Sequence, residues 1–302
     1  MHFLAILCAF FWGLAAAGFG FYCLNAARQI TYVTLADGRK QERTIPFMMR
    51  LLLPLTPNLF PLVSLPTFNQ SREVADARLV AAGFDGLLEG REFLALKFLL
   101  PIIFGTLWLM FLRVIVHIAP DFSNNVLSMA VLGIALLWIY PVFWLRRTLK
   151  ARHRAIQRAL PFVLDLLTLS VEAGLDFMTA LQRNCERRKL DPLNEELIRM
   201  IREIQLGTAR RVALKNMSTR VALEDLRSVT YSLIQADELG VSIGAILRIQ
   251  SEQMRQRRFD RAERLANEAP VKLLFPLMLF IFPAVFIILL GPLLTQAVGQ
   301  LF

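Results

Sequence analysis

The feature that most constrains this chain is a long polar segment, residues 146–270, placed between two apolar segments. Each flanking segment is close to the ~20 residues that an α-helix needs to cross the hydrocarbon of a bilayer. The polar segment opens with a basic run: Arg146, Arg147, Lys150, Arg152, Arg154 and Arg158. The sequence therefore predicts a polar domain that membrane spans hold against a bilayer.

Composition agrees with this division. The 302-residue chain is 56% hydrophobic and contains 23 Phe, against about 45–50% apolar residues in a soluble domain. It nevertheless carries 34 Lys and Arg and 24 Asp and Glu, a net charge of +10. Such a surplus suits nucleic acid or anionic lipid, and the apolar segments favour lipid headgroups. Because acids interrupt the basic residues and few aromatics accompany them, no nucleic-acid partner is expected.

Four segments have the length and composition of membrane spans: residues 3–24, 93–118, 126–145 and 271–294. In the first, Ala15 to Ala17 resembles a signal-peptide cleavage site, but no Lys or Arg precedes the apolar run. This favours an uncleaved anchor. We expect an all-α integral membrane protein with about four transmembrane helices and a helical bundle of about six helices.

The distribution of basic residues predicts the orientation. All Lys and Arg except Arg113 lie within residues 25–97 and 146–272, and basic loops stay in the cytoplasm. The sequence thus predicts a multi-pass inner (plasma) membrane protein with both termini outside the cytoplasm. The expected divisions are an N-terminal transmembrane helix (1–24), a cytoplasmic or interfacial segment (25–92), a transmembrane hairpin (93–145), a cytoplasmic helical bundle (146–270) and a C-terminal transmembrane helix with an outside tail (271–302).

Residues 25–92 are mixed in character. Residues 31–38 predict a short strand and turn. Residues 45–65 are apolar but contain Pro46, Pro54, Pro57 and Pro61, which argue against a straight span; this stretch is expected in the interface or packed on other helices. Residues 71–83 predict an amphipathic helix that ends at Gly83.

Helical periodicity runs through residues 146–270 without a strand pattern. Six helices are predicted. The first runs from Pro161 to Gly174, the second covers residues 175–189, and the third runs from the N-cap Asp191 to Gly207. The fourth covers residues 208–217, the fifth runs from about Leu223 to Gly240, and the sixth covers residues 242–268. The last becomes charged all round, and we expect it to project as a stalk from bundle to membrane. A solvated or headgroup-facing surface is the alternative interpretation of its charges.

No catalytic, cofactor-binding or metal site is predicted. There is no phosphate-binding loop, and His2, His117 and His153 lack metal-ligand spacing. Glu195–Glu196 and Glu224–Asp225 are interpreted as solvated charges and caps. Cys8, Cys23 and Cys185 are expected to be inert thiols. Arg113 and His117 share a helix face, which raises a transport hypothesis, but both can snorkel to the loop at 119–125.

Four stretches resemble the F-domain family of type II secretion and type IV pilus platform proteins. They are PFVLDLLTLSVEAGLD (161–176), IQLG (204–207) with Ala213–Leu214, ADELGVSI (236–243) and APVKLLFPL (269–277). The pair Ala236–Asp237 departs from the Gly of the general pattern and is similar to the Tad (tight adherence) branch. The last stretch is the most specific and is similar to the TadB/TadC-type platform proteins, of which we favour the TadC-like over the TadB-like.

The resemblance implies a non-enzymatic inner-membrane platform without cofactors. Its implied partners are a paralogous TadB-like platform protein, a cytoplasmic secretion-type hexameric ATPase, pilin subunits and the lipid bilayer, in a homo- or hetero-oligomer. ATPase movements would be coupled to extraction and polymerisation of pilin subunits. The residues that we expect to form structural turns or a partner interface are Glu172, Gly174, Gly207, Glu238, Gly240, Pro270, Pro276 and Pro283.

A small membrane transporter or channel is the alternative function. It would explain Arg113, His117 and the proline-rich last span. It leaves the charged helical segment unexplained, and the spans carry few polar residues to line a path.

Overall fold

The computed structural model describes residues 32–34, 40–42, 45–118 and 126–301. The first predicted span (residues 3–24) and the loop at 119–125 lie outside the described residues. Strands β1 (Tyr32–Thr34) and β2 (Lys40–Glu42) pair antiparallel, with Val33 opposite Gln41. Strand β1 falls within the short strand that the sequence predicts, while the predicted turn at Asp37–Gly38 lies outside the described residues.

The proline-rich stretch forms short helices that pack on other helices and do not span a membrane. They are α2 (Phe47–Leu52), η1 (Leu53–Leu59), α3 (Phe60–Val63) and η2 (Pro66–Phe68). Three of them begin with Pro at the first or second helical position, where its missing N–H costs little. Met49 and Leu52 are fully buried against residues of the later helices.

Helix α4 (Asn69–Ala82) ends at Gly83, whose φ of 85° forms the left-handed cap that the sequence predicts. Next come α5 (Gly90–Ile118) and α6 (Val126–Glu172), which form a hairpin. Along the described chain, three helices have the length and composition to cross a membrane: α5, α6 and α11 (Ile243–Leu301). The fold is that of an all-α membrane protein.

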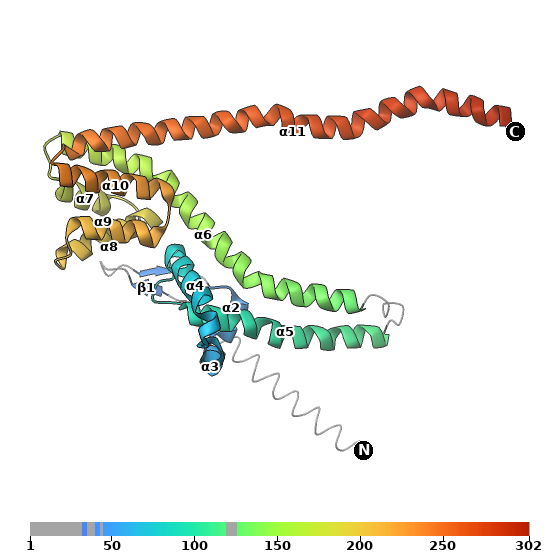
Figure 1. Cartoon of the computed structure of the whole chain (residues 1–302), viewed down its shortest axis with the longest axis horizontal. Helices are drawn as coiled ribbons and strands as arrows, with labels where there is room; N and C mark the ends of the chain where they lie inside the picture. Colours follow the sequence, from blue (N-terminus) through green and yellow to red (C-terminus); the bar gives the residue numbers. More distant parts are fainter. Residues whose placement is uncertain (1–31, 35–39, 43–44, 119–125, 302) are drawn as a thin grey trace, which may run out of the picture.

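Helix α6 corrects one boundary. The sequence predicts a new helix near Pro161, but α6 runs without a break from Val126 to Glu172, with Pro141 and Pro161 inside it. The buried positions Ile156, Leu160 and Leu164 keep one helical phase across the proline, and packing of this face outweighs the lost hydrogen bond. Figure 1 shows that α6 follows α5 at first and then slants toward the bundle.

The bundle is completed by α7 (Phe177–Arg187), α8 (Pro192–Gln205), α9 (Arg210–Val221), α10 (Glu224–Leu239) and the first part of α11. The side chain of Asp176 accepts a hydrogen bond from the Met178 amide, and Asp191 accepts one from Asn194. These N-caps fix the starts of α7 and α8. The Asp191 cap is the one that the sequence predicts.

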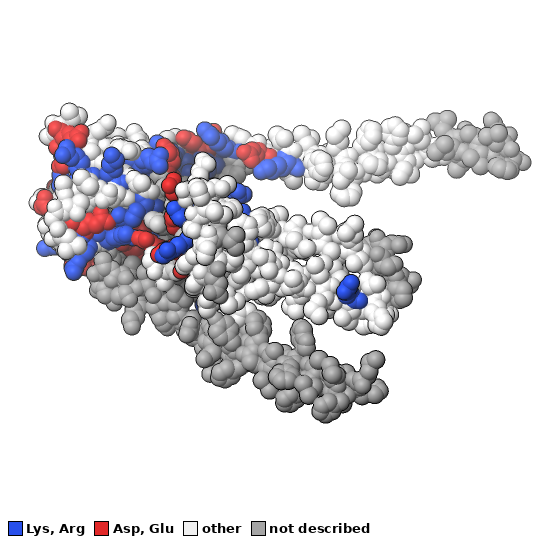
Figure 2. All heavy atoms as spheres, turned by 60° about the horizontal axis from the view of Figure 1, so that its bottom comes forward, with Lys and Arg blue, Asp and Glu red and all other residues white. Residues whose placement is uncertain are grey.

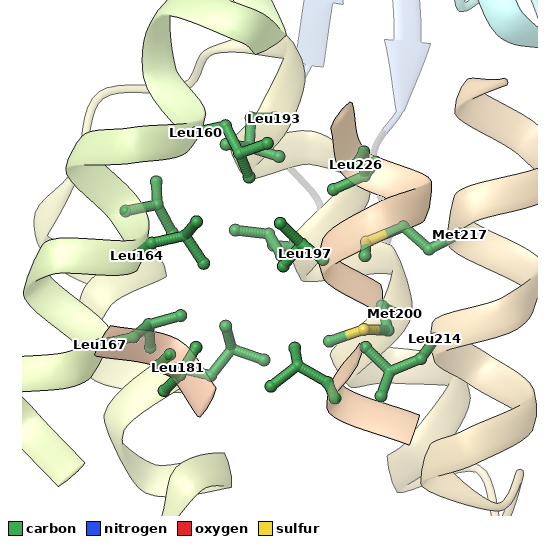
Figure 3. Packing of buried hydrophobic residues seen from close by; sticks show 14 of the residues in the cluster. Leu160, Leu164, Leu167, Leu181, Leu193, Leu197, Met200, Leu214, Met217 and Leu226 are labelled. Carbon is green, nitrogen blue, oxygen red and sulfur yellow. The ribbon is translucent and has the colours of Figure 1, made fainter. Parts of the chain in front are cut away.

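Leu and Met side chains from all these helices fill one core (Figure 3). The labelled members are Leu160, Leu164, Leu167, Leu181, Leu193, Leu197, Met200, Leu214, Met217 and Leu226. Leu193 and Met200 on α8 are almost fully buried, so α8 sits between its neighbours. The apolar cluster is that of a domain with its own core.

Helix α11 leaves the bundle as one long helix (Figure 1). Its charged part ends near Pro270, and the apolar part that follows is exposed within the chain. In Figure 2 the charged atoms gather over the bundle, while the projecting helices are mostly white. Charge and apolar surface are therefore segregated along the molecule, as a membrane requires.

Candidate interaction site at the distal end of the bundle

Three helix–helix turns meet at the end of the bundle farthest from the apolar parts of α5, α6 and α11 (Figure 1). They join α6 to α7, α8 to α9, and α10 to α11. Each turn contains a glycine with positive φ: Gly174 at 90°, Gly207 at 97° and Gly240 at 67°. The residue after each glycine donates a backbone hydrogen bond to the carbonyl five residues earlier, as Val241 does to Ala236. This is the Schellman pattern, and glycine is the residue that enters it without strain.

Charged side chains tie these turns together. Arg210 at the start of α9 forms an ion pair with Asp237, and its guanidinium lies over the Phe177 ring at 5.6 Å from the centroid. Next to it, Arg211 and Glu238 pair at 3.3 Å. On α11, Arg248 approaches Glu172 of α6 to 2.9 Å. The helix ends are thus held in one arrangement by contacts between elements that are distant in sequence.

Apolar side chains stand exposed among these charges. Leu206 is 76% exposed and Leu239 is 77% exposed; Val212 and Val241 are about half exposed, at 44% and 46%. We call this surface the distal face: Glu172, Gly174, Leu206, Gly207, Val212, Glu238, Leu239, Gly240 and Val241. Exposed aliphatic residues gathered on a rigid, charged end of a domain are typical of a protein interface.

The structure brings together five of the residues singled out from the sequence: Glu172, Gly174, Gly207, Glu238 and Gly240. The other three, Pro270, Pro276 and Pro283, lie far along α11 on its exposed length. Sequence reasoning missed Leu206 and Leu239. The signal that could have found them is an apolar residue directly before a C-cap glycine, outside the periodic core positions.

A second polar cluster lies inside the bundle and corrects the interpretation of Glu195 and Glu196. The sequence suggested solvated carboxylates, but both are buried and face Arg152 of α6. Arg152 Nη1 donates to Glu195 at 2.7 Å and Nη2 to Glu196 at 3.0 Å. Arg152 follows the spacing of the buried Ile156 and Leu160, which was the available signal that it points inward.

The cluster continues toward the surface. Arg220 of α9 donates to Glu196 at 3.2 Å and to Glu203 at 2.6 Å. Farther along α8, Arg199 pairs with Asp85 at 2.6 Å. Since Asp85 lies between α4 and α5, this last pair joins the bundle to the base of the hairpin. The ion pairs therefore lead from the bundle interior to the membrane-proximal helices.

Helices α6 and α11 are joined by a polar seam. Asp165 accepts hydrogen bonds from Ser251 and, at 2.9 Å, from Arg255. The hydrogen bond that Arg255 donates to Asp165, together with the negative charge of that carboxylate, raises the pKa of Arg255. Nearer the membrane, Asp225 accepts from Gln157 of α6 and Arg257 of α11, each at 3.0 Å. Asp225 thus links α6, α10 and α11. The interpretation of Asp225 from the sequence, as a solvated charge or cap, did not include these contacts.

Metal-binding chemistry has no support in the described part of the chain, where no group of three or more His, Cys, Asp or Glu could hold an ion. Cys185 is a buried thiol that is in no disulfide of the described chain, while Cys8 and Cys23 lie outside the described residues. Arg113 and His117 are exposed at the end of α5 that leads into the loop at 119–125. Among the described residues, the distal face is the surface whose geometry suits interaction with a partner.

The architecture defines a helical membrane protein with a folded polar bundle. Residues 163–291 match the family model described as Type II secretion system (T2SS), protein F. The match starts on α6, includes α7 to α10 and ends on the apolar part of α11. It supports the F-domain family for this chain. No curated protein and no solved structure matches the chain.

The family match and the three long apolar helices together indicate an inner-membrane protein. F-domain proteins are non-catalytic platform proteins of secretion and pilus systems, and they generally work with a cytoplasmic ATPase and other partners of the machinery.

Proposed function

We propose that this chain is a platform protein of a Tad-type pilus machine, of the TadC type. It would couple a cytoplasmic hexameric ATPase to the extraction of pilin subunits from the bilayer and their polymerisation. A paralogous platform protein of the TadB type would be its partner in a larger oligomer. The Tad-like stretches at 236–243 and 269–277 support this assignment within the F-domain family.

The observation that carries the proposal is the continuity of α6 and α11 between the bundle and the membrane-length segments. A continuous helix transmits a displacement along its axis because hydrogen bonds join successive turns, and the prolines inside α6 and α11 each remove only one such bond. The two helices are also fastened to each other inside the bundle through Asp165 and Asp225. A push on the bundle would therefore move both membrane segments together.

The distal face is where we place the ATPase contact. It lies at the opposite end of the bundle from the membrane segments (Figure 1), so force applied there acts over the whole length of the domain. In the proposed orientation the bundle lies in the cytoplasm and both termini lie outside. Exposed Leu206 and Leu239 supply apolar contact area, while Glu172, Glu238 and Arg211 supply charge that fixes the register.

The experiment compares tagged full-length chains recovered from native membranes with mild detergent. We expect mass spectrometry to find a secretion-type ATPase and a second F-domain protein with the wild-type chain. The Leu239→Glu variant should be recovered without the ATPase, and cells that carry it should lack pili. The matched control is Ile249→Glu on α11, an exposed aliphatic residue of the same bundle outside the distal face, which should retain both.

Two results would overturn the proposal. Leu239→Glu could retain the ATPase and normal piliation, which would remove the distal face from the contact. The wild-type chain could instead come without such partners and support solute flux in liposomes, which would favour a transporter. The groove between α5 and α6 does not favour transport, because its lining is apolar, with Phe104, Trp108 and Leu136 among the residues.

A further inference from the structure

A stripe of cations runs along the slanted part of α6, between its apolar half and the bundle core. Arg146, Lys150, Arg154 and Arg158 follow one another at intervals of four residues, and Arg147 stands beside the first. All are exposed. Positions four apart share a helix face, so the four side chains form a row about 18 Å long.

The charges of this row are not compensated within the described chain. Arg146, Arg147, Lys150, Arg154 and Arg158 form no ion pair or hydrogen bond there. Arg152, in the same stretch, differs because it turns inward to Glu195 and Glu196. On α11 the cations are mixed: Arg255, Arg257 and Lys272 have acidic partners, while the exposed Arg258, Arg261 and Arg264 form no ion pair in the described chain. A row of like charges repels itself and is stabilised only by external anions.

The position of the cation row on α6 indicates which anions are available to bind it. Asp225 holds α6 and α11 together at Gln157 and Arg257, and beyond this point the two helices diverge (Figure 1). Both then continue into apolar, membrane-length segments. The buried side of α6, with Arg152 and Ile156, faces the bundle, so the cation row is on the opposite side. The row therefore borders the membrane surface between the two points of entry.

Basic residues that only fix the orientation of a span lie in the headgroup region beside it, and this does not account for all four residues of the row. The headgroup region is only about 5–8 Å deep on each side of the hydrocarbon. On an upright helix, Arg154 and Arg158 would stand beyond it. Because α6 slants after the hairpin (Figure 1), the long side chains of these residues come within reach of phosphate groups. A slanted helix with cations on its outer side is the arrangement by which a helix rests on an anionic bilayer surface.

We propose that Arg146, Lys150, Arg154 and Arg158 form a binding surface for the anionic headgroups of membrane phospholipids. The surface holds the slanted part of α6 against the bilayer and so fixes the angle at which the bundle stands. Guanidinium groups bind phosphate oxygens through paired N–H donors, which suits three of the four positions. This inference does not depend on the pilus machine or on its ATPase.

The test uses the full-length chain in nanodiscs of neutral phosphatidylcholine, with or without phosphatidylglycerol. Phenylglyoxal modifies accessible arginines, and mass spectrometry gives the rate at each position. We expect the anionic lipid to slow modification of Arg154 and Arg158 by about fivefold, and high salt to reverse the effect. Arg183 and Arg202, which are also exposed and outside any ion pair of the described chain, should not change.

A variant pair gives a second readout. The double variant Arg154→Gln, Arg158→Gln should retain less anionic phospholipid through detergent purification than the matched pair Arg183→Gln, Arg202→Gln. Equal modification rates in neutral and anionic nanodiscs would overturn the proposal. Protection in native membranes without protection in anionic nanodiscs would also overturn it, and would identify an acidic protein as the partner.

Discussion

Arg152 and Glu196 meet inside the bundle although 44 residues separate them, with Arg152 Nη2 at 3.0 Å from Glu196 Oε1. Both side chains are more than nine-tenths buried. Removing the cation by Arg152→Ala would leave Glu195 and Glu196 in the interior without it. We expect the free energy of unfolding to fall by about 3–5 kcal/mol. Titration of the detergent-solubilised chain with dodecyl sulfate, followed by circular dichroism, measures this loss.

The control for Arg152→Ala is Arg154→Ala, two residues along the same helix and exposed. It should change the unfolding free energy by no more than about 0.5 kcal/mol. Equal losses in the two variants would mean that the loss comes from removing any arginine of α6 and not from breaking the buried ion pairs.

Local signals in the sequence were sufficient for much of the bundle. The N-cap Asp191 with Pro192, and the C-cap glycines Gly207 and Gly240, are short-range features whose geometry depends on a few neighbouring residues. The continuity of α6 through Pro161 was not predictable in this way. It depends on a buried face that keeps its phase across the proline, which is tertiary packing and overrides the local preference of proline.

The candidate site was predictable only in part for the same reason. Glycines mark turns in a sequence, but nothing in the sequence shows that the turns at Gly174, Gly207 and Gly240 share one end of the bundle. That depends on the directions of the helices. Likewise, Glu195 and Glu196 look like any solvated carboxylates until Arg152 of another helix is placed beside them.

Gly240→Val should strain the turn between α10 and α11. Gly240 has a φ of 67°, and a β-carbon built there meets no atom within 4 Å. The cost therefore comes from the backbone conformation rather than from a clash. A β-branched residue is a clear outlier at positive φ, and we expect a loss of about 1–2 kcal/mol, measured as a lower midpoint of thermal unfolding in detergent.

Gly240→Asn separates the backbone effect from loss of the glycine itself. Asparagine tolerates the left-handed conformation better than other side chains, so this variant should melt close to the wild type. If Val and Asn at this position lowered the midpoint equally, the strain argument would fail. Pilus counts for the same variants would show whether the turn between α10 and α11 also matters for assembly.

Ala222→Gly should stabilise the chain. Ala222 caps α9 with a φ of 53°, and it is the non-glycine residue with positive φ in the described chain. Glycine adopts this conformation without the steric cost that alanine has. We expect a net gain of about 0.5–1 kcal/mol in the free energy of unfolding, which is what remains after the greater freedom of glycine in the unfolded chain is subtracted. The exposed Ala151 on α6 is the control, because Ala151→Gly should lower the unfolding midpoint.

The proposed orientation leads to a prediction for fusions of a reporter enzyme that is active only outside the cytoplasm. Fused after Phe302, the reporter should be active, because residues 295–302 carry no Lys or Arg. Inserted at Arg188, between α7 and α8, it should be inactive, since the surrounding bundle contains most of the basic residues and basic segments are retained inside. A cytoplasm-specific reporter at the two positions is the matched control and should give the opposite pattern. Activity at Arg188 and silence at Phe302 would reverse the orientation and place the distal face out of reach of a cytoplasmic ATPase.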